Sequence, residues 1–65
     1  MTNGNLVDYY VSCYRFTVWV QCVKGQSGNI AIVDCAPFVS KFRGQYLSNL
    51  VKWAKNFGGF KIKEI

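Results

Sequence analysis

The chain has no histidine, only three acidic residues and a single proline among its 65 residues. Histidine is the side chain that most often acts as a general base near neutral pH, so its absence removes the commonest form of acid–base catalysis. The three acids, Asp8, Asp34 and Glu64, are far apart in the sequence, and no nucleophile elbow or phosphate-binding glycine loop accompanies them. We therefore expect a protein that is not an enzyme and that holds no cofactor.

The three cysteines follow no metal-binding spacing, and no histidine is present to complete a zinc site. We expect no metal. Free cysteine commonly packs as a small apolar side chain, which predicts that Cys13, Cys22 and Cys35 are buried thiols. Cys35 is the least unfavourable candidate nucleophile, but the neighbouring carboxylate of Asp34 opposes formation of a thiolate.

Long apolar runs are also missing. No stretch approaches the roughly 20 residues of a membrane span, and the polar residues 1–5 lack the basic and apolar segments of a signal peptide. We expect no membrane association and a location in the cytoplasm. Residues 1–65 should form one small domain, with residues 1–6 flexible.

Apolar and basic residues are abundant. Half of the chain is apolar and 17% is aromatic, which is more than a small monomer hides easily and favours self-association. The net charge of +5 favours an anionic partner, such as nucleic acid, a nucleotide or an acidic protein surface.

Residues 7–24 are rich in β-branched and aromatic residues and contain no glycine or proline, which predicts one long strand or two joined by an irregularity. A turn at residues 25–29 should close an antiparallel hairpin with residues 29–34. If that loop has four residues, Ala31, Val33 and Cys35 join the core face; a one-residue bulge exchanges the faces. The expected core face of the first strand comprises Tyr14, Phe16, Val18, Val20 and Cys22.

The second half of the chain has the period of helices. A short helical turn is expected at residues 37–42 and the main helix at residues 45–57, which Gly58 and Gly59 end before a last strand at residues 60–65. The fold class is therefore α+β, a three-stranded antiparallel sheet with one amphipathic helix on one face. The other face keeps Trp19, Ile30 and Ile32, and a homodimer is the simplest cover for them.

Two groups of residues are candidate ligand-binding sites. An exposed aromatic between polar and basic groups is typical of surfaces on which bases stack while cations meet phosphates. The alternative, which the uncovered apolar residues favour, is that Trp19 packs in a dimer interface with Ile30 and Ile32. A small stable protein can also act as an inhibitor that blocks a host protein through exposed aromatic and basic side chains. The first group is Arg15, Thr17, Trp19 and Gln21, and the second is Lys41 and Arg43, joined by Lys52, Lys55, Lys61 and Lys63.

Residues 32–38, written IVDCAPF, precede a glycine, a tryptophan-containing helix and a Gly-Gly step into the last strand. This pattern resembles short uncharacterised proteins of phages, archaeal viruses and mobile elements, in which a hairpin ends in Val-Asp-Ala-(Ala/Pro)-Pro-Ile. The resemblance covers about residues 16–64, and it implies a viral or mobile origin and a small α+β form. For a protein of such an origin we expect a role in regulation through nucleic acid, or in counter-defence by binding a host factor or a nucleotide signal. The matching positions are Val33, Asp34, Ala36, Pro37, Gly44, Trp53 and Gly59.

Within this stretch, Asp34 has two possible roles. It can cap the turn that Pro37 begins by accepting backbone N–H bonds, or it can pair with Arg15 on the face of Trp19.

Overall fold

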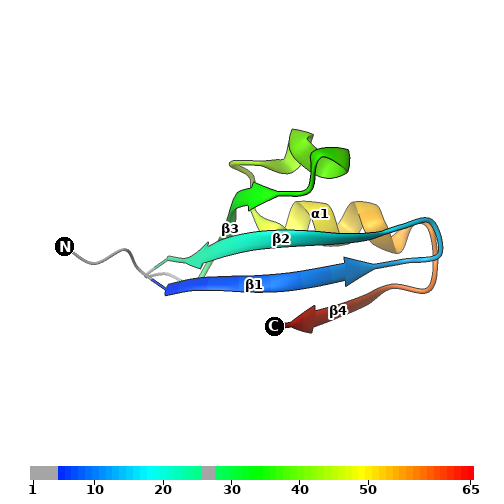
Figure 1. The fold of residues 1–65 in the computed structure, drawn as a ribbon, viewed down its shortest axis with the longest axis horizontal. Helices are drawn as coiled ribbons and strands as arrows, with labels where there is room; N and C mark the ends of the chain where they lie inside the picture. Colours follow the sequence, from blue (N-terminus) through cyan, green and yellow to red (C-terminus); the bar gives the residue numbers. More distant parts are fainter. Residues whose placement is uncertain (1–4, 26–27) are drawn as a thin grey trace.

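The chain folds into an antiparallel sheet with one α-helix packed against one of its faces (Figure 1). The computed structural model describes residues 5–25 and 28–65, and within these ranges it contains four strands, one 3₁₀-helix and one α-helix. The strand order across the sheet is β3-β2-β1-β4. The elements are β1 (Asn5–Ser12), β2 (Thr17–Lys24), β3 (Ile30–Cys35), η1 (Pro37–Phe42), α1 (Leu47–Lys55) and β4 (Lys61–Glu64).

The α+β class, the antiparallel sheet and the single main helix are confirmed, but the prediction of three strands is wrong. Residues 7–24 form two strands separated by a turn, in which the amide of Cys13 donates to the carbonyl of Phe16 at 2.8 Å. The amide of Tyr14 donates to the carbonyl of Gly58 at 2.9 Å, so the turn is held by the chain that follows α1. Of the segment 1–6 that we expected to be flexible, residues 1–4 lie outside the described residues and residues 5 and 6 begin β1.

The core lies between the sheet and the two helices. The register pairs Val11 with Val18 and Tyr9 with Val20, so these side chains of β1 and β2 point to the same face. The expected core positions Val18, Val20 and Cys22 are confirmed, and the apolar stripe of α1 packs above them. Phe16 packs against this core, whereas the expectation for Tyr14 is wrong, because Tyr14 lies in the turn before β2 and is 83% exposed. The buried residues are Val11, Val18, Val20, Cys22, Ile32, Cys35, Val39, Phe42, Leu47, Leu50 and Ala54.

The faces of β3 are exchanged relative to the prediction. Lys24 pairs with Ile30, so the loop holds the five residues 25–29 rather than four, and Cys22 pairs with Ile32. Ile32 is therefore fully buried under the helices, and Ile30 is half-buried on the same side. The expectation that they share an uncovered interface with Trp19 is wrong, because one added loop residue reverses every side chain of a paired strand.

A bulge then restores the expected alignment at the end of β3. The register shifts between Gln21 and Cys22, and Val33 is the unpaired residue, 43% exposed instead of in the core. Beyond the bulge Val20 pairs with Cys35, which is buried as predicted.

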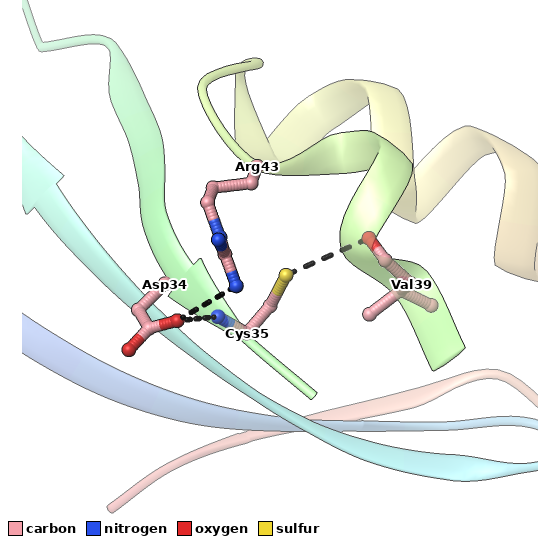
Figure 2. A network of polar contacts seen from close by, with 4 residues as sticks. All are labelled: Asp34, Cys35, Val39 and Arg43. Carbon is pink, nitrogen blue, oxygen red and sulfur yellow. Dashed lines mark hydrogen bonds and ion pairs between the residues drawn. The ribbon is translucent and has the colours of Figure 1, made fainter. Parts of the chain in front are cut away.

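The stretch IVDCAPF forms the corner between β3 and η1 (Figure 2). Oδ1 of Asp34 accepts the amide of Cys35 at 2.9 Å and lies 3.3 Å from Nη2 of Arg43. The thiol of Cys35 donates to the carbonyl of Val39 at 3.5 Å. Asp34 thus pairs with Arg43 and not with Arg15, and it accepts one backbone amide without capping η1, whose N-cap is Ala36.

Candidate nucleic-acid interface

The second face of the sheet has no helix over it in the part of the chain that the structure describes (Figure 1). Side chains alternate across a strand, so the residues between the buried positions of β1 and β2 point to this side. We call it the open face. It is formed by Leu6, Asp8, Tyr10, Ser12, Thr17, Trp19, Gln21, Val23, Ala31, Asp34, Lys61 and Lys63.

An aromatic row crosses the middle of the open face. Tyr10 pairs with Trp19 on one side and with Lys63 on the other, so an indole, a phenol and an ammonium group stand next to one another on three strands. Directly paired residues have Cβ atoms about 4.5–5.5 Å apart, close enough for these side chains to act on one ligand. Tyr10 is 47% exposed and Trp19 is half-buried.

A polar row lies beside the aromatic row. Ser12 pairs with Thr17 and with Lys61, which adds two hydroxyl groups and a second ammonium group. The aromatic pair is therefore flanked by cations on the β4 side. Aromatic surfaces accept bases and ammonium groups accept phosphates, which is the combination found in proteins that bind single strands.

The open face also carries two acids, because Asp8 and Asp34 both pair with Gln21, and the Asp34 carboxylate is in turn paired with Arg43. Asp8 pairs with Gln21, and its Oδ1 atom is buried without a hydrogen-bond partner among the described residues. A carboxylate repels phosphate, so the negative end of the open face lies toward the start of β1 and the positive end toward β4.

Three of the four residues in the first predicted ligand group lie on the open face, namely Thr17, Trp19 and Gln21. Arg15 does not. Its guanidinium carbon lies 5.7 Å from the centre of the Phe57 ring, because the turn at residues 13–16 interrupts the alternation of the strand.

The second predicted group is not brought together. Nζ of Lys41 lies 4.6 Å from the centre of the Trp53 ring, whereas Arg43 pairs with Asp34. Lys41 of the second group therefore lies on the helix side of the sheet, and Lys61 and Lys63 lie on the open face.

Tyr10 and Ser12 are not among the predicted site residues, but the structure places them at the centre of the open face. Both lie in the first half of residues 7–24, for which the sequence predicts one long strand or two joined by an irregularity, so it does not specify their neighbours across the sheet. The available signal was the alternation of Val7, Tyr9 and Val11 with polar or aromatic residues, which is typical of a separate strand with one covered face.

The cysteine thiols and the possible metal ligands are the other groups to consider as reactive sites. Cys22 and Cys35 are buried and Cys13 is half-buried. Burial, with smaller contributions from the charges of Asp8 and Cys35, raises the pKa of the Cys22 thiol to about 11, so this thiol is protonated at neutral pH. Within residues 5–25 and 28–65 no group of His, Cys, Asp or Glu side chains could hold a metal ion.

An apolar groove of about 440 Å³ runs between the end of the β2–β3 loop and α1, with Ile30, Tyr46 and Val51 in its walls and Lys52 at its rim.

No helix in the described part of the chain has the length and apolar character needed to cross a membrane. Comparison with known proteins found no matching family model, no matching curated protein and no matching solved structure.

Proposed function

We propose that this protein is a non-catalytic binding protein that holds single-stranded nucleic acid on the open face of its sheet. The observation that carries the proposal is the row of Trp19, Tyr10 and Lys63, which sets two aromatic rings and a cation side by side on three strands. Bases that are not paired with a second strand expose their π-faces, and a stacked base contributes about 1–3 kcal/mol to binding.

Each part of the open face has a role in this proposal. The rings of Trp19 and Tyr10 stack on successive bases, while Lys61 and Lys63 contact the phosphates that connect them. The amide of Gln21 reaches base edges, which present hydrogen-bond donors and acceptors. The net charge of +5 attracts a polyanion over a longer range.

The biological setting belongs to the same proposal. Regulation or counter-defence in the cytoplasm of a host cell is the role that the resemblance to phage, archaeal-virus and mobile-element proteins supports. Recognition of a nucleic acid or nucleotide can serve both roles, with no chemistry by the protein itself.

The first prediction concerns the two aromatic residues. Trp19→Ala and Tyr10→Ala should each weaken binding of a fluorescein-labelled 12-nucleotide single strand by about 5- to 100-fold, the equivalent of one lost stacking contact. Fluorescence anisotropy at low salt measures the change. Tyr46→Ala is the matched control, because Tyr46 is 52% exposed, close to the 47% of Tyr10, and lies outside the open face.

Two results would contradict the proposal. One is the absence of salt-sensitive binding to single strands at tens of micromolar protein. The other is equal affinity of the Trp19→Ala, Tyr10→Ala and Tyr46→Ala variants. Light scattering of the same samples tests the expected homodimer. If the mass is twice 7.4 kDa and falls to 7.4 kDa in Trp19→Ala, the open face serves self-association instead.

A further inference from the structure

Five aromatic rings gather on the helix side of the sheet, away from the open face. Phe16 lies at their centre, with its ring 5.2 Å from that of Phe38, 5.3 Å from that of Trp53 and 5.8 Å from that of Phe57. Phe42 completes the group, 5.3 Å from Trp53. We call these five residues the aromatic cluster; the turn before β2, both helices and the segment after α1 contribute to it.

One ring of the aromatic cluster is not needed for the core. Val39 and Phe42 are the residues of η1 that are buried, whereas Phe38 is 66% exposed. A large ring held at the surface by a packed base is the type of side chain that anchors protein–protein contacts.

Two cations frame the aromatic cluster. Nζ of Lys41 lies 4.6 Å from the centre of the Trp53 ring, and the guanidinium of Arg15 lies 5.7 Å from that of Phe57. In the part of the chain that the structure describes, neither cation forms an ion pair, since the one ion pair found there joins Arg43 to Asp34. The cluster thus has positive charge without local neutralisation.

The other two acids lie on the sheet. Asp8 is on the open face. Glu64 in β4 pairs with Tyr9 and so lies on the helix side, but among the described residues it forms no ion pair with Lys41 or Arg15. A ligand for the aromatic cluster must therefore bring its own negative charge to complement Lys41 and Arg15.

The ring faces restrict the class of ligand further. Phe16 stacks on the indole of Trp53 at an interplanar angle of 24°, and Lys41 lies over the same indole. Phe57 is likewise covered by Arg15. A stacked base would have to compete with these partners for the ring faces, whereas the exposed Phe38 provides apolar area suited to an aliphatic or aromatic side chain.

We propose that the aromatic cluster is a second binding surface, which docks an acidic segment of a partner protein. One apolar side chain of the segment packs against Phe38, and its carboxylates face Lys41 and Arg15. This surface does not depend on the open face, so the protein has two binding surfaces on opposite sides of its sheet.

The test is a selection from a display library of random 12-residue peptides, with removal of peptides that also bind Phe38→Ser. Selected peptides should contain several Asp or Glu residues and at least one Leu, Phe or Trp. A synthetic peptide of the selected sequence should lose at least tenfold in affinity toward Phe38→Ser and toward Lys41→Glu, measured by isothermal titration calorimetry. Trp19→Ala and Tyr46→Ala are controls that should retain affinity.

Several outcomes would overturn this proposal. The selection can yield no peptides, or peptides without acidic residues, or the selected peptide can bind Phe38→Ser as well as the native chain. Three further results would assign the aromatic cluster to another partner. Sedimentation with phosphatidylglycerol vesicles that depends on Phe38 indicates a membrane, and oligonucleotide binding that depends on Phe38 indicates a nucleic acid. A dimer mass that Phe38→Ser abolishes indicates a second copy of the chain. Circular dichroism establishes that each variant is folded. If Phe38→Ser does not fold, the affinity of the peptide for Lys41→Glu decides the proposal.

Discussion

At the scale of single residues, the thiol of Cys22 connects burial with pH. Cys22 is 0% exposed, and its pKa is raised from the ordinary value of 9.0 to about 11, first by burial and then by the charges of Asp8 and Cys35. The folded chain therefore retains the thiol proton at a pH where the unfolded chain loses it. The resulting stability is complete below pH 9 and is lost as the pH rises through about 11.

We predict that the free energy of unfolding falls by about 1–3 kcal/mol between pH 9 and pH 11 because of this thiol. Urea unfolding at half-unit steps of pH measures it. Cys22→Ala serves as the control, because it removes the thiol and keeps every lysine and tyrosine in the chain; its one effect on them is to remove the smallest of the three causes that raise the pKa of Tyr9. Parallel stability profiles of the two proteins would show that Cys22 has no such effect.

Asp34 is a second residue whose role is decided by its contacts. Its side chain and that of Arg43 are both about half exposed, at 52% and 56%, and exposed ion pairs contribute roughly 0–1 kcal/mol. Asp34→Asn keeps an oxygen that accepts the amide of Cys35. We predict a loss of less than about 1 kcal/mol in thermal unfolding and unchanged affinity for a single strand, with a larger loss of stability in Asp34→Ala.

Unchanged stability together with lost affinity would make Asp34 part of the ligand-binding site. If Asp34→Asn melts like the native chain but loses tenfold or more in affinity, the carboxylate contacts the ligand directly. In that case the pair with Arg43 is not its main role.

At the scale of elements, the turn between β1 and β2 is fixed by the segment that follows α1. Gly58 and Gly59 have φ angles of 81° and 68°, the left-handed conformation expected where a helix ends. A Cβ atom on Gly59 would lie 2.5 Å from ring carbons of Tyr14, whose own amide donates to Gly58. The two segments are therefore packed as one unit.

We predict that Gly59→Ala lowers the free energy of unfolding by about 1–3 kcal/mol, from the strained φ angle together with the clash. In a Tyr14→Ala background the clash is gone, and the cost of Gly59→Ala should fall to about 1 kcal/mol. Gly44→Ala is the matched control, since Gly44 has a φ of 86° and open space around it. A double-mutant cycle in urea measures the difference, and strict additivity would mean that Tyr14 does not hold the turn.

At the scale of the whole molecule, charge is divided between the two sides of the sheet. Lys61 and Lys63 stand on the open face, whereas Lys41 and Arg15 stand over the aromatic cluster. If two lysines contact phosphates, the logarithm of the binding constant for a single strand should fall with the logarithm of salt concentration with a slope of about −1.4.

We predict that Lys63→Gln reduces the magnitude of this slope by about 0.7, the contribution of one phosphate contact to a single strand. Lys52→Gln, which changes a lysine of α1 at the rim of the groove, should leave it unchanged. Anisotropy titrations at several salt concentrations give both values. Equal slopes for Lys63→Gln and Lys52→Gln would place the nucleic acid elsewhere on the chain.

The periodicity of the sequence alone determined the helical half of the fold. The stripe of Leu47, Leu50 and Ala54, and the glycines that end the helix, predicted α1 correctly because helix signals are local. The alternation around Val18 and Val20 gave the core face of β2 for the same reason.

Only the tertiary structure decided the sheet and the candidate site. The turn at residues 13–16 has no glycine or proline and depends on Tyr14 packing against a segment more than forty residues later. The faces of β3 depended on one loop residue and one bulge, which composition does not specify. The row of Trp19, Tyr10 and Lys63 joins three strands from both ends of the chain, and such a juxtaposition exists only once the strands have paired.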